Sequence, residues 1–339
     1  VMAYTGISML VLWICLFFYV IAAGIYFGTG CFAFYMHMSG EEKKSKVLYK
    51  YMINPIWGLI NICCVFCYVG MIALFPSAIH YLNTMILIPG SIALICIIIR
   101  GCSYIFINKR ADISLPWLLI YCLSGLGIPA ALASVLTISE GGYIVEDGAH
   151  LDLNWVQLAI SPFAWSVVFL AVITVLYISA GFLTYSAAKL KDTHVYLTVR
   201  KWLLLWSMPM IMVSLFVFLS LRIQNANHFT NAIYNYWWMF TLSLLCFIIA
   251  MSLALLKKYH GIAMLMMILQ LFFAFFGYGL SKLPYIVYPF VKITDTTVSV
   301  ATGLTLMIVI ILGLLLLIPS LILLLRLATD NKGIVKNQK

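Results

Sequence analysis

The carboxylates of this chain could carry protons, and their positions decide whether they could do so inside a membrane. Ten acidic residues are present, and each falls between the long apolar stretches of the sequence or in a tail. They are Glu41, Glu42, Asp112, Glu140, Glu146, Asp147, Asp152, Asp192, Asp295 and Asp330. A proton-coupled secondary transporter usually keeps an ionisable residue within its spanning helices. The distribution therefore argues against that class of transporter.

The six histidines could bind a metal or a haem, but they too lie at the ends of the apolar stretches or between them. They are His37, His80, His150, His194, His228 and His260. Interfacial water satisfies a ring at such a position, so we predict polar interfacial roles. A histidine at a helix end could still ligate a haem near the membrane surface. A haem deep in the membrane would find no histidine ligand here.

The nine cysteines all fall inside apolar stretches or at their ends. They are Cys15, Cys31, Cys63, Cys64, Cys67, Cys96, Cys102, Cys122 and Cys246. On a helix, Cys63 and Cys67 share a face, which makes a metal or iron–sulfur site conceivable. Such a site needs further ligands that this neighbourhood lacks. We therefore predict that the cysteines pack as small apolar side chains.

Arg100 is the one charge that could be buried, because it follows Ile97, Ile98 and Ile99 directly. One interpretation is that its side chain extends to the cytoplasmic surface from the end of a helix. The other is a buried ion pair, or an anionic partner such as a haem propionate or a lipid phosphate. The sequence leaves both open. No glycine-rich phosphate loop, nucleophile triad or metal motif is present.

These polar residues are scattered among apolar side chains, which make up 65% of the 339 residues, while 9% are charged. The mean hydropathy is +1.09. No soluble core could bury this much apolar surface. The apolar stretches are continuous rather than alternating, which favours spanning helices over outer-membrane strands. The sequence therefore predicts an all-α polytopic membrane protein.

A helix needs roughly 20 apolar residues to cross the hydrocarbon layer, and the chain divides into nine such stretches. The predicted helices lie at residues 6–36, 55–75, 78–107, 115–138, 162–188, 202–221, 236–256, 262–280 and 298–327. An odd number of helices places the two termini on opposite sides of the membrane.

The basic residues predict which side each terminus occupies. All but three of the 20 Lys and Arg residues fall in one set of alternate connections or in the C-terminal tail, and the exceptions are Arg222, Lys282 and Lys292. Because basic residues gather on the cytoplasmic side, we expect an outside N-terminus and a cytoplasmic C-terminus. The net charge of +10 then indicates topology and attraction for anionic lipid, not nucleic-acid binding.

Three stretches of the chain resemble subunit II of cytochrome bd-type quinol oxidases, as a divergent member of the Gram-positive-like type. Residues 23–30 (AGIYFGTG) are similar to the GFDxGxG-type signature of the first helix. Residues 54–61 (NPIWGLIN), 75–76, 88–91 and 100–101 are similar to the second and third helices. Residues 275–289 (FFGYGLSKLPYIVYP) and 314–320 complete the likeness. The resemblance covers essentially the whole chain.

Two residues depart from the family pattern. Tyr26 replaces the acid of the first signature, and Gly58 replaces the acid after the tryptophan of the second helix. In the family these acids are associated with a hydrophilic route for protons towards the haems. Protons could instead come through the partner subunit, or by water and hydroxyls near Tyr26 and Asn61, or the chain could be a paralogue with altered activity. We take Tyr26, Trp57, Asn61 and Arg100 as candidates that line this route, with core packing as the alternative for Trp57.

The resemblance also implies an architecture and a set of contacts between helices. It implies one transmembrane domain over residues 1–339, with four-helix bundles at 1–138 and 162–280 and a peripheral ninth helix at 298–327. Glycines spaced one turn apart let two helices approach closely. The candidate packing residues are Gly24, Gly28, Gly30, Gly277, Gly279 and Pro284.

The activity that the resemblance implies belongs to a complex in a bacterial plasma membrane. A partner, subunit I, would hold haem b, haem d and the quinol site, and the complex would reduce O₂ to water with cytoplasmic protons. This chain would ligate no haem or metal and hold no catalytic residue. The resemblance leaves room for a small single-helix accessory subunit and for bound lipid.

Two other classes of function stay open from the sequence. A transporter or channel would use helices broken around Pro89, Pro129 and Pro209 as a central site. A non-catalytic assembly partner would copurify with haem proteins and be dispensable for turnover.

Overall fold

The computed structural model of this chain is built almost entirely of long helices. It describes residues 2–40, 53, 56–109, 114–147, 150–190 and 193–295, together with 304–305, 308–309, 311–313, 315 and 319. The long helices are α1 (Met2–Met38), α3 (Ile56–Leu74), α4 (Ile79–Lys109), α5 (Leu115–Ile138), α7 (Pro162–Lys189), α8 (Thr193–Gln224), α10 (Trp237–Leu256) and α11 (His260–Lys282). Among the described residues, seven helices are long and apolar enough to cross a membrane, and Ile60–Leu74 of α3 forms a shorter apolar helix.

The described helices match eight of the nine predicted stretches in position. The ninth, at 298–327, lies largely outside the described residues, so a total of nine spanning helices stays a prediction. The largest difference in bounds is at α8, which begins at Thr193 and not at residue 202. Its first turns carry Arg200, which donates to the carbonyl oxygens of Ala254 (2.6 Å) and Leu255 (3.0 Å) at the end of α10. Because hydropathy treats Arg200 as a boundary, it misses this polar extension of the helix.

Pro89, Pro129 and Pro209 lie inside helices that continue through them, namely α4, α5 and α8. Proline removes one backbone hydrogen bond and often kinks a helix, but membrane helices tolerate it when neighbouring groups compensate. The broken helices expected for a central transport site are therefore not formed at these prolines, and the transporter alternative loses that support.

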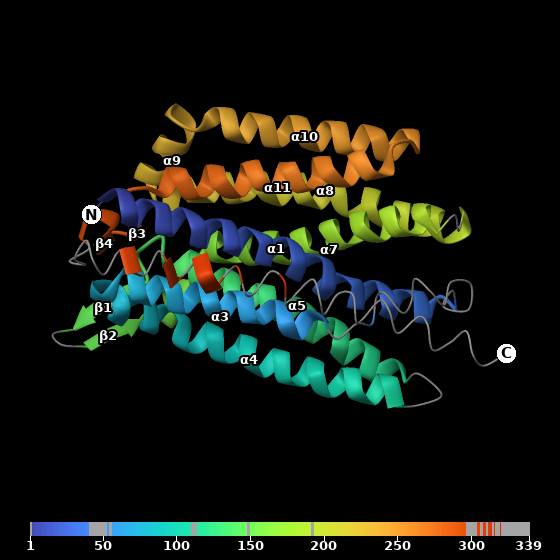
Figure 1. Cartoon of the computed structure of the whole chain (residues 1–339), viewed down its shortest axis with the longest axis horizontal. Coiled ribbons are helices and arrows are strands. Elements are labelled where there is room, and N and C mark those ends of the chain that lie inside the picture. The colour runs from blue at the N-terminus through green and yellow to red at the C-terminus, as the bar shows by residue number, and fades with distance from the viewer. Residues whose placement is uncertain are drawn as a thin grey trace.

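Helix α1 lies in the middle of the molecule and packs against α3, α5 and α7. Figure 1 shows α8, α10 and α11 on one side of α1 and α3, α4 and α5 on the other. Further contacts join α4 to α5, α7 to α8 and α10 to α11. Large apolar side chains remain exposed on the outward faces, such as Leu87 on α4, Met208 on α8 and Leu245 on α10. Exposed apolar faces of this kind suit lipid or a membrane partner.

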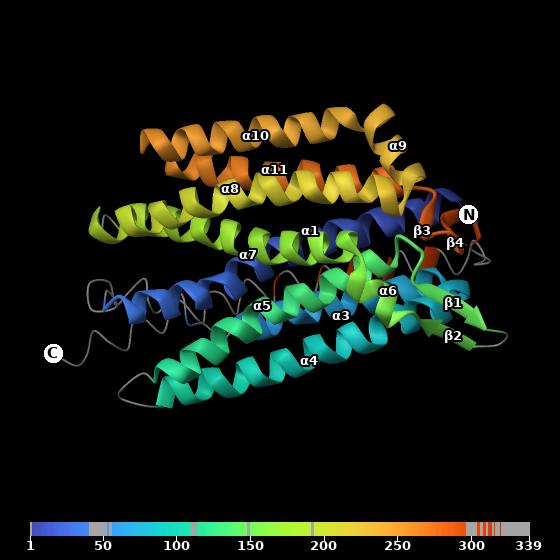
Figure 2. The same cartoon turned by 180° about the vertical axis from the view of Figure 1, so that it is seen from behind.

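Two hairpins and two short helices lie together at one end of the helices, which we call the hairpin end (Figures 1 and 2). The elements are β1 (Ile144–Asp147), β2 (His150–Leu153), α6 (Trp155–Ile160), α9 (Ala226–Tyr234), β3 (Tyr285–Val287) and β4 (Val291–Lys292), with the 3₁₀ turns η2 (Pro76–Ala78) and η3 (Ile293–Asp295). Strands β1 and β2 pair antiparallel, with Ile144 opposite Leu153. Strands β3 and β4 also pair antiparallel, with an irregularity between Tyr285 and Val287.

Candidate functional site

Arg100 is completely buried in α4, so its side chain does not extend to the surface. Its guanidinium donates to the carbonyl oxygen of Tyr121 on α5 at 2.6 Å and to that of Tyr26 on α1 at 2.9 Å. The guanidinium carbon lies 3.8 Å from the centre of the Tyr121 ring and 5.4 Å from that of Phe27. Among the open interpretations of Arg100, burial is correct, and the contacts seen here are with carbonyl oxygens and aromatic rings.

Two glycines make room for this buried side chain. A Cβ on Gly125 of α5 would overlap the Arg100 guanidinium and lie 2.9 Å from the carbonyl oxygen of Phe27. A Cβ on Gly30 of α1 would lie 2.7 Å from the Tyr121 ring and 3.3 Å from the guanidinium. Arg100 therefore ties α1, α4 and α5 together through a space that only residues without a side chain leave open.

The other candidates for a polar route lie on α1 and α3. Asn61 accepts a hydrogen bond of 3.4 Å from the hydroxyl of Tyr19, a buried residue of α1. Tyr26 lies seven residues further along α1, and its carbonyl oxygen also accepts from the Thr29 hydroxyl at 3.0 Å. Residues seven apart share a helix face, which was the sequence signal that could have identified Tyr19. Trp57 falls within α3, and its side chain lies outside the described part of the structure.

A second polar cluster lies at the hairpin end around Glu140, which follows α5. Glu140 lies in the loop after α5, where the sequence places it, and has no exposed surface. Its carboxylate lies 3.0 Å from Nδ1 of His228 and 3.3 Å from the Lys282 ammonium. It also accepts from Asn225 Nδ2 at 3.1 Å and from the Tyr278 hydroxyl. The loop position predicted for Glu140 is therefore correct, and the structure shows in addition that this loop is buried within the protein.

His228 is buried as well, so protein groups satisfy its ring and not the interfacial water that was expected. Its second ring nitrogen, Nε2, lies 2.8 Å from the Ser281 hydroxyl. The ring therefore bridges α9, the Glu140 loop and the end of α11. Neither the spacing of these residues in the sequence nor their hydropathy brings them together. They meet through tertiary contacts of His228 with Glu140 and with Ser281, which lie about 90 and 50 residues away in the sequence.

The turn that carries Glu140 requires two glycines. Gly141 and Gly142 adopt φ of 90° and 85°, a region that glycine favours. A Cβ on Gly141 would lie 2.7 Å from the carbonyl oxygen of Tyr288, whose amide donates to Ser139 at 3.0 Å. The Gly141 carbonyl accepts from Gln224 Nε2 at 2.7 Å. These contacts hold the carboxylate in place between α8, α9 and α11.

The pKa of Glu140 reflects two opposing effects. Burial raises it, because a buried carboxylate loses hydration. The ammonium of Lys282 and the hydrogen bonds from His228 and Tyr278 lower it more, and the net effect is a pKa lowered to about 2. Glu140 is therefore charged throughout the physiological pH range, as the stabilising partner of Lys282.

The cysteines partly depart from the expectation of simple packing. Cys31 of α1 and Cys122 of α5 form a disulfide, so packing as separate small side chains was the wrong expectation for this pair. Cys15, Cys63 and Cys67 are free and buried. Within the described residues, no group of three or more His, Cys, Asp or Glu side chains is arranged to hold a metal ion.

The glycines of the predicted packing residues lie against other helices. A Cβ on Gly24 would lie 2.7 Å from Ile178 of α7, and one on Gly28 would overlap Ser179 of the same helix. A Cβ on Gly277 of α11 would lie 3.2 Å from the Phe240 ring, and one on Gly279 would lie 2.6 Å from the Trp13 ring. Pro284 follows α11 in a cis peptide bond with Leu283.

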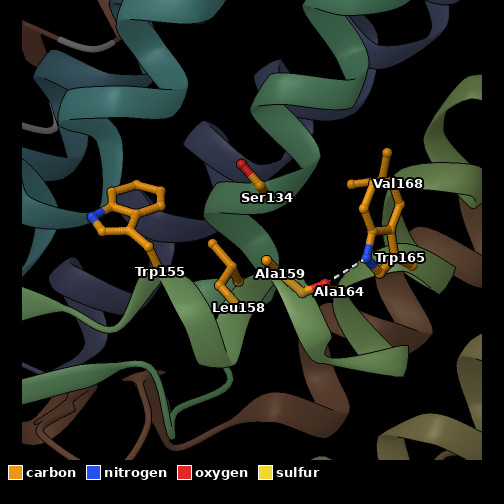
Figure 3. Close-up of a pocket in the computed structure, with 7 residues that line it drawn as sticks. All are labelled: Ser134, Trp155, Leu158, Ala159, Ala164, Trp165 and Val168. Carbon is orange, nitrogen blue, oxygen red and sulfur yellow. Dashed lines mark hydrogen bonds between the residues drawn. The ribbon is translucent and has the colours of Figure 1, made fainter.

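Two of the cavities formed by the described residues lie at the hairpin end. One of about 180 Å³ lies between α5, α6 and α7, and Figure 3 shows Trp155 and Trp165 on opposite sides of it. The indole nitrogen of Trp165 donates to the Ala159 carbonyl at 2.8 Å. The residues around it are Ser134, Trp155, Leu158, Ala159, Ala164, Trp165 and Val168. No titratable side chain lines this cavity. The other cavity, of about 330 Å³, is lined in part by His228 and Lys282 of the Glu140 cluster.

Taken together, the described helices and the buried polar contacts between them define a polytopic helical membrane protein, and three comparisons give its family. The chain belongs to the family of cytochrome bd terminal oxidase subunit II, whose model matches residues 4–328. It is 26% identical to a protein of Bacillus subtilis (strain 168) that is provisionally named cytochrome bd menaquinol oxidase subunit II, over 98% of each chain. It is also similar to the structure of bd oxidase from Geobacillus thermodenitrificans, with 39% identity and a TM-score of 0.79 over 96% of this chain and 98% of that one.

The family membership confirms the resemblance inferred from the sequence, and the chain is a subunit of a quinol oxidase complex. As a subunit II it has a subunit I as its partner in that complex. The expectation of a multi-pass membrane protein is confirmed with it.

Proposed function

We propose that this chain binds no haem and stabilises a haem-bearing subunit I, which would hold haem b, haem d and the quinol site. The supporting observation is the placement of histidines in the described spanning helices. His37, His80, His194 and His260 occupy only first or last turns, and His228 is engaged by Glu140 and Ser281. The exposed apolar faces would supply the contact with subunit I.

The proposed topology follows the basic residues and the helix order. The hairpin end would face outside, and residues 298–327 would form a ninth, peripheral helix beside two four-helix bundles. The complex would oxidise quinol at the outer side and reduce O₂ to water with cytoplasmic protons. The name of the Bacillus subtilis relative favours menaquinol as the quinol.

A tagged form of this chain, purified from its native membranes, tests the subunit role directly. We expect it to copurify with a second large subunit, identified by mass spectrometry. The reduced-minus-oxidised visible spectrum should show b-type and chlorin-type haem signals carried by that subunit. A partnerless protein without haem would contradict the proposal and would make transport the better explanation.

The proposed role in proton supply rests on the polar groups of α1 and α3. None of the described spanning helices contains Asp or Glu, so any route through them must use hydroxyls, amides and water. The Tyr19 hydroxyl and the Asn61 amide form such a pair inside the helix bundle. Arg100 fixes the α1 backbone at Tyr26, on the same helix face. These groups would pass protons from the cytoplasmic side towards subunit I.

Replacing Asn61 with Leu should lower the rate of oxygen consumption by roughly fivefold. The loss of one hydrogen bond should raise the barrier to proton transfer by about 1 kcal/mol, which corresponds to that factor. The haem content, read from the visible spectrum, should stay unchanged. Asn83→Leu is the matched control, since Asn83 accepts from the Tyr68 hydroxyl at 2.6 Å on an exposed surface between α3 and α4. Equal turnover in the Asn61→Leu and Asn83→Leu complexes would remove Asn61 from the route.

A further inference from the structure

Ser281, near the end of α11, lies beside the ring of His228 in the Glu140 cluster. Its hydroxyl oxygen is 2.8 Å from Nε2 of His228, and the other ring nitrogen, Nδ1, is 3.0 Å from the Glu140 carboxylate. A hydroxyl, an imidazole and a carboxylate in this order form the arrangement by which hydrolases activate a serine. This arrangement is recognised by its geometry and not by sequence position. Three residues from separate segments can therefore form it without a sequence motif.

The tautomer of His228 follows from the charge of Glu140. An ionised carboxylate only accepts hydrogen bonds, so Nδ1 must carry a proton towards it. The ammonium of Lys282, at 3.3 Å, already balances the charge of this carboxylate, which favours an uncharged ring. In an uncharged ring with a protonated Nδ1, Nε2 is an acceptor. It therefore accepts from the Ser281 hydroxyl, for which the Tyr278 carbonyl oxygen, at 3.0 Å, is the alternative acceptor.

The groups that orient the His228 ring are themselves held by hydrogen bonds. The Glu140 carboxylate accepts from Asn225 Nδ2 at 3.1 Å and from the Tyr278 hydroxyl. The side-chain oxygen of Asn225 in turn accepts from the backbone amide of His228 at 3.1 Å. Glu140 and Asn225 thus fix both the ring and the backbone that carries it. A base that is already oriented loses little freedom when it acts.

A cavity gives small molecules access to this serine. It has a volume of about 330 Å³, and both Ser281 and His228 line it although both are buried. Asn227 and Pro284, which also line it, are exposed, so the cavity opens to the surface. Leu283 and Pro284 contribute apolar wall, which suits the carbon chain of an acyl group.

The same wall carries donors for the oxygen that becomes negative when a serine attacks a carbonyl group. Asn227 Nδ2 donates to the Tyr288 hydroxyl at 3.3 Å, and this bond does not use the hydroxyl proton of Tyr288. The Asn227 amide also has a second N–H group. Donors that are directed at the developing charge lower the barrier to acyl transfer. The cavity thus combines a nucleophile, a base and hydrogen-bond donors.

We propose that Ser281 is a nucleophile that hydrolyses carboxylic esters, with His228 as its general base and Glu140 as the positioning residue. Ser281 Oγ attacks the carbonyl carbon of the ester while its proton passes to His228 Nε2. The ester C–O bond then breaks, the alcohol leaves with that proton, and the acyl group stays on Ser281. Water next gives a proton to Nε2 and adds to the acyl carbon. The bond to Oγ breaks as the proton returns to Ser281, and the carboxylic acid is released.

Labelling of the purified complex with a fluorophosphonate tests the nucleophile. An activated serine forms a bond to the phosphorus of this probe and displaces fluoride, and peptide mass spectrometry identifies the labelled residue. We expect the label on Ser281 of the wild-type complex. An unlabelled Ser281 would overturn the proposal, and this result does not depend on how any variant folds.

Hydrolysis of p-nitrophenyl butyrate by the same complex is the second measurement. Ser281→Ala and His228→Asn should each lower the rate by about 10²–10⁴-fold, the range that a general base contributes. Glu140→Gln should lower kcat with little change in KM, because Glu140 acts only through the ring. Ser134→Ala is the matched control, since Ser134 lines the other cavity of the hairpin end, and it should hydrolyse the ester like wild type.

Equal rates of ester hydrolysis in Ser281→Ala and Ser134→Ala would overturn the assignment of the nucleophile. Labelling of Ser281 at an undiminished rate in His228→Asn would overturn the role of the base. This inference goes beyond the proposed oxidase role, because it involves neither haem nor quinol. Both measurements are made without quinol, so their outcome is independent of whether the oxidase proposal holds.

Discussion

Replacing Glu140 with Gln is expected to destabilise the protein by roughly 3–5 kcal/mol, the range for removing one partner of a buried ion pair. The carboxylate is unexposed and lies 3.3 Å from the Lys282 ammonium. Without it, Lys282 would remain at the end of α11 as a buried charge without its counter-ion. The His228 ring would also lose a charged acceptor at 3.0 Å. Thermal unfolding of the purified complex should show the loss as a lower Tm.

Asp152→Asn provides the matched control for this prediction. Asp152 lies on β2 at the same end of the molecule, and its side chain is exposed. The Asp152→Asn substitution removes the same charge from the chain without disturbing a buried contact, so it should change the free energy of unfolding by no more than about 0.5 kcal/mol. A Glu140→Gln complex as stable as Asp152→Asn would show that the cluster contributes no stability.

The same residue shows why the sequence predicted the helices better than the site. Continuous apolar stretches identify spanning helices because each helix satisfies its own backbone within the membrane. Glu140 lies just after such a stretch, and hydropathy treats any charged residue there as solvated. Its burial depends on His228 and Lys282, which lie 88 and more residues away. No local pattern contains that information.

The burial of Arg100 could not be predicted from the sequence for a similar reason. Its position after three isoleucines allowed either burial or extension to the surface. In the structure Arg100 is buried, because Gly30 of α1 and Gly125 of α5 leave space for its guanidinium. Three helices must be placed together before that space exists. The pairing of Cys31 with Cys122, at a sequence separation of 91, likewise depends on how α1 and α5 pack.

The contact between α1 and α7 leads to the second large expected effect, that of Gly28→Ala. A Cβ at this position would overlap the Ser179 hydroxyl and lie 2.6 Å from the carbonyl oxygen of Val175. The backbone of α7 cannot turn aside as a side chain could, so the two helices must separate. Overpacking of this kind costs about 1–3 kcal/mol. We expect Gly28→Ala to lower the Tm and the yield of assembled complex, and Gly28→Val to do so further.

Gly6→Ala, in the same helix, should have the opposite effect on stability. A Cβ on Gly6 meets nothing within 4 Å, so the substitution adds helix propensity without a clash and should stabilise α1 by up to about 1 kcal/mol. The comparison separates the packing at Gly28 from any general response of α1 to a lost glycine. If both variants raise the Tm, α1 and α7 do not approach as closely as Gly28 indicates. A fall in Gly28→Ala alone would establish that this glycine holds the two helices in contact.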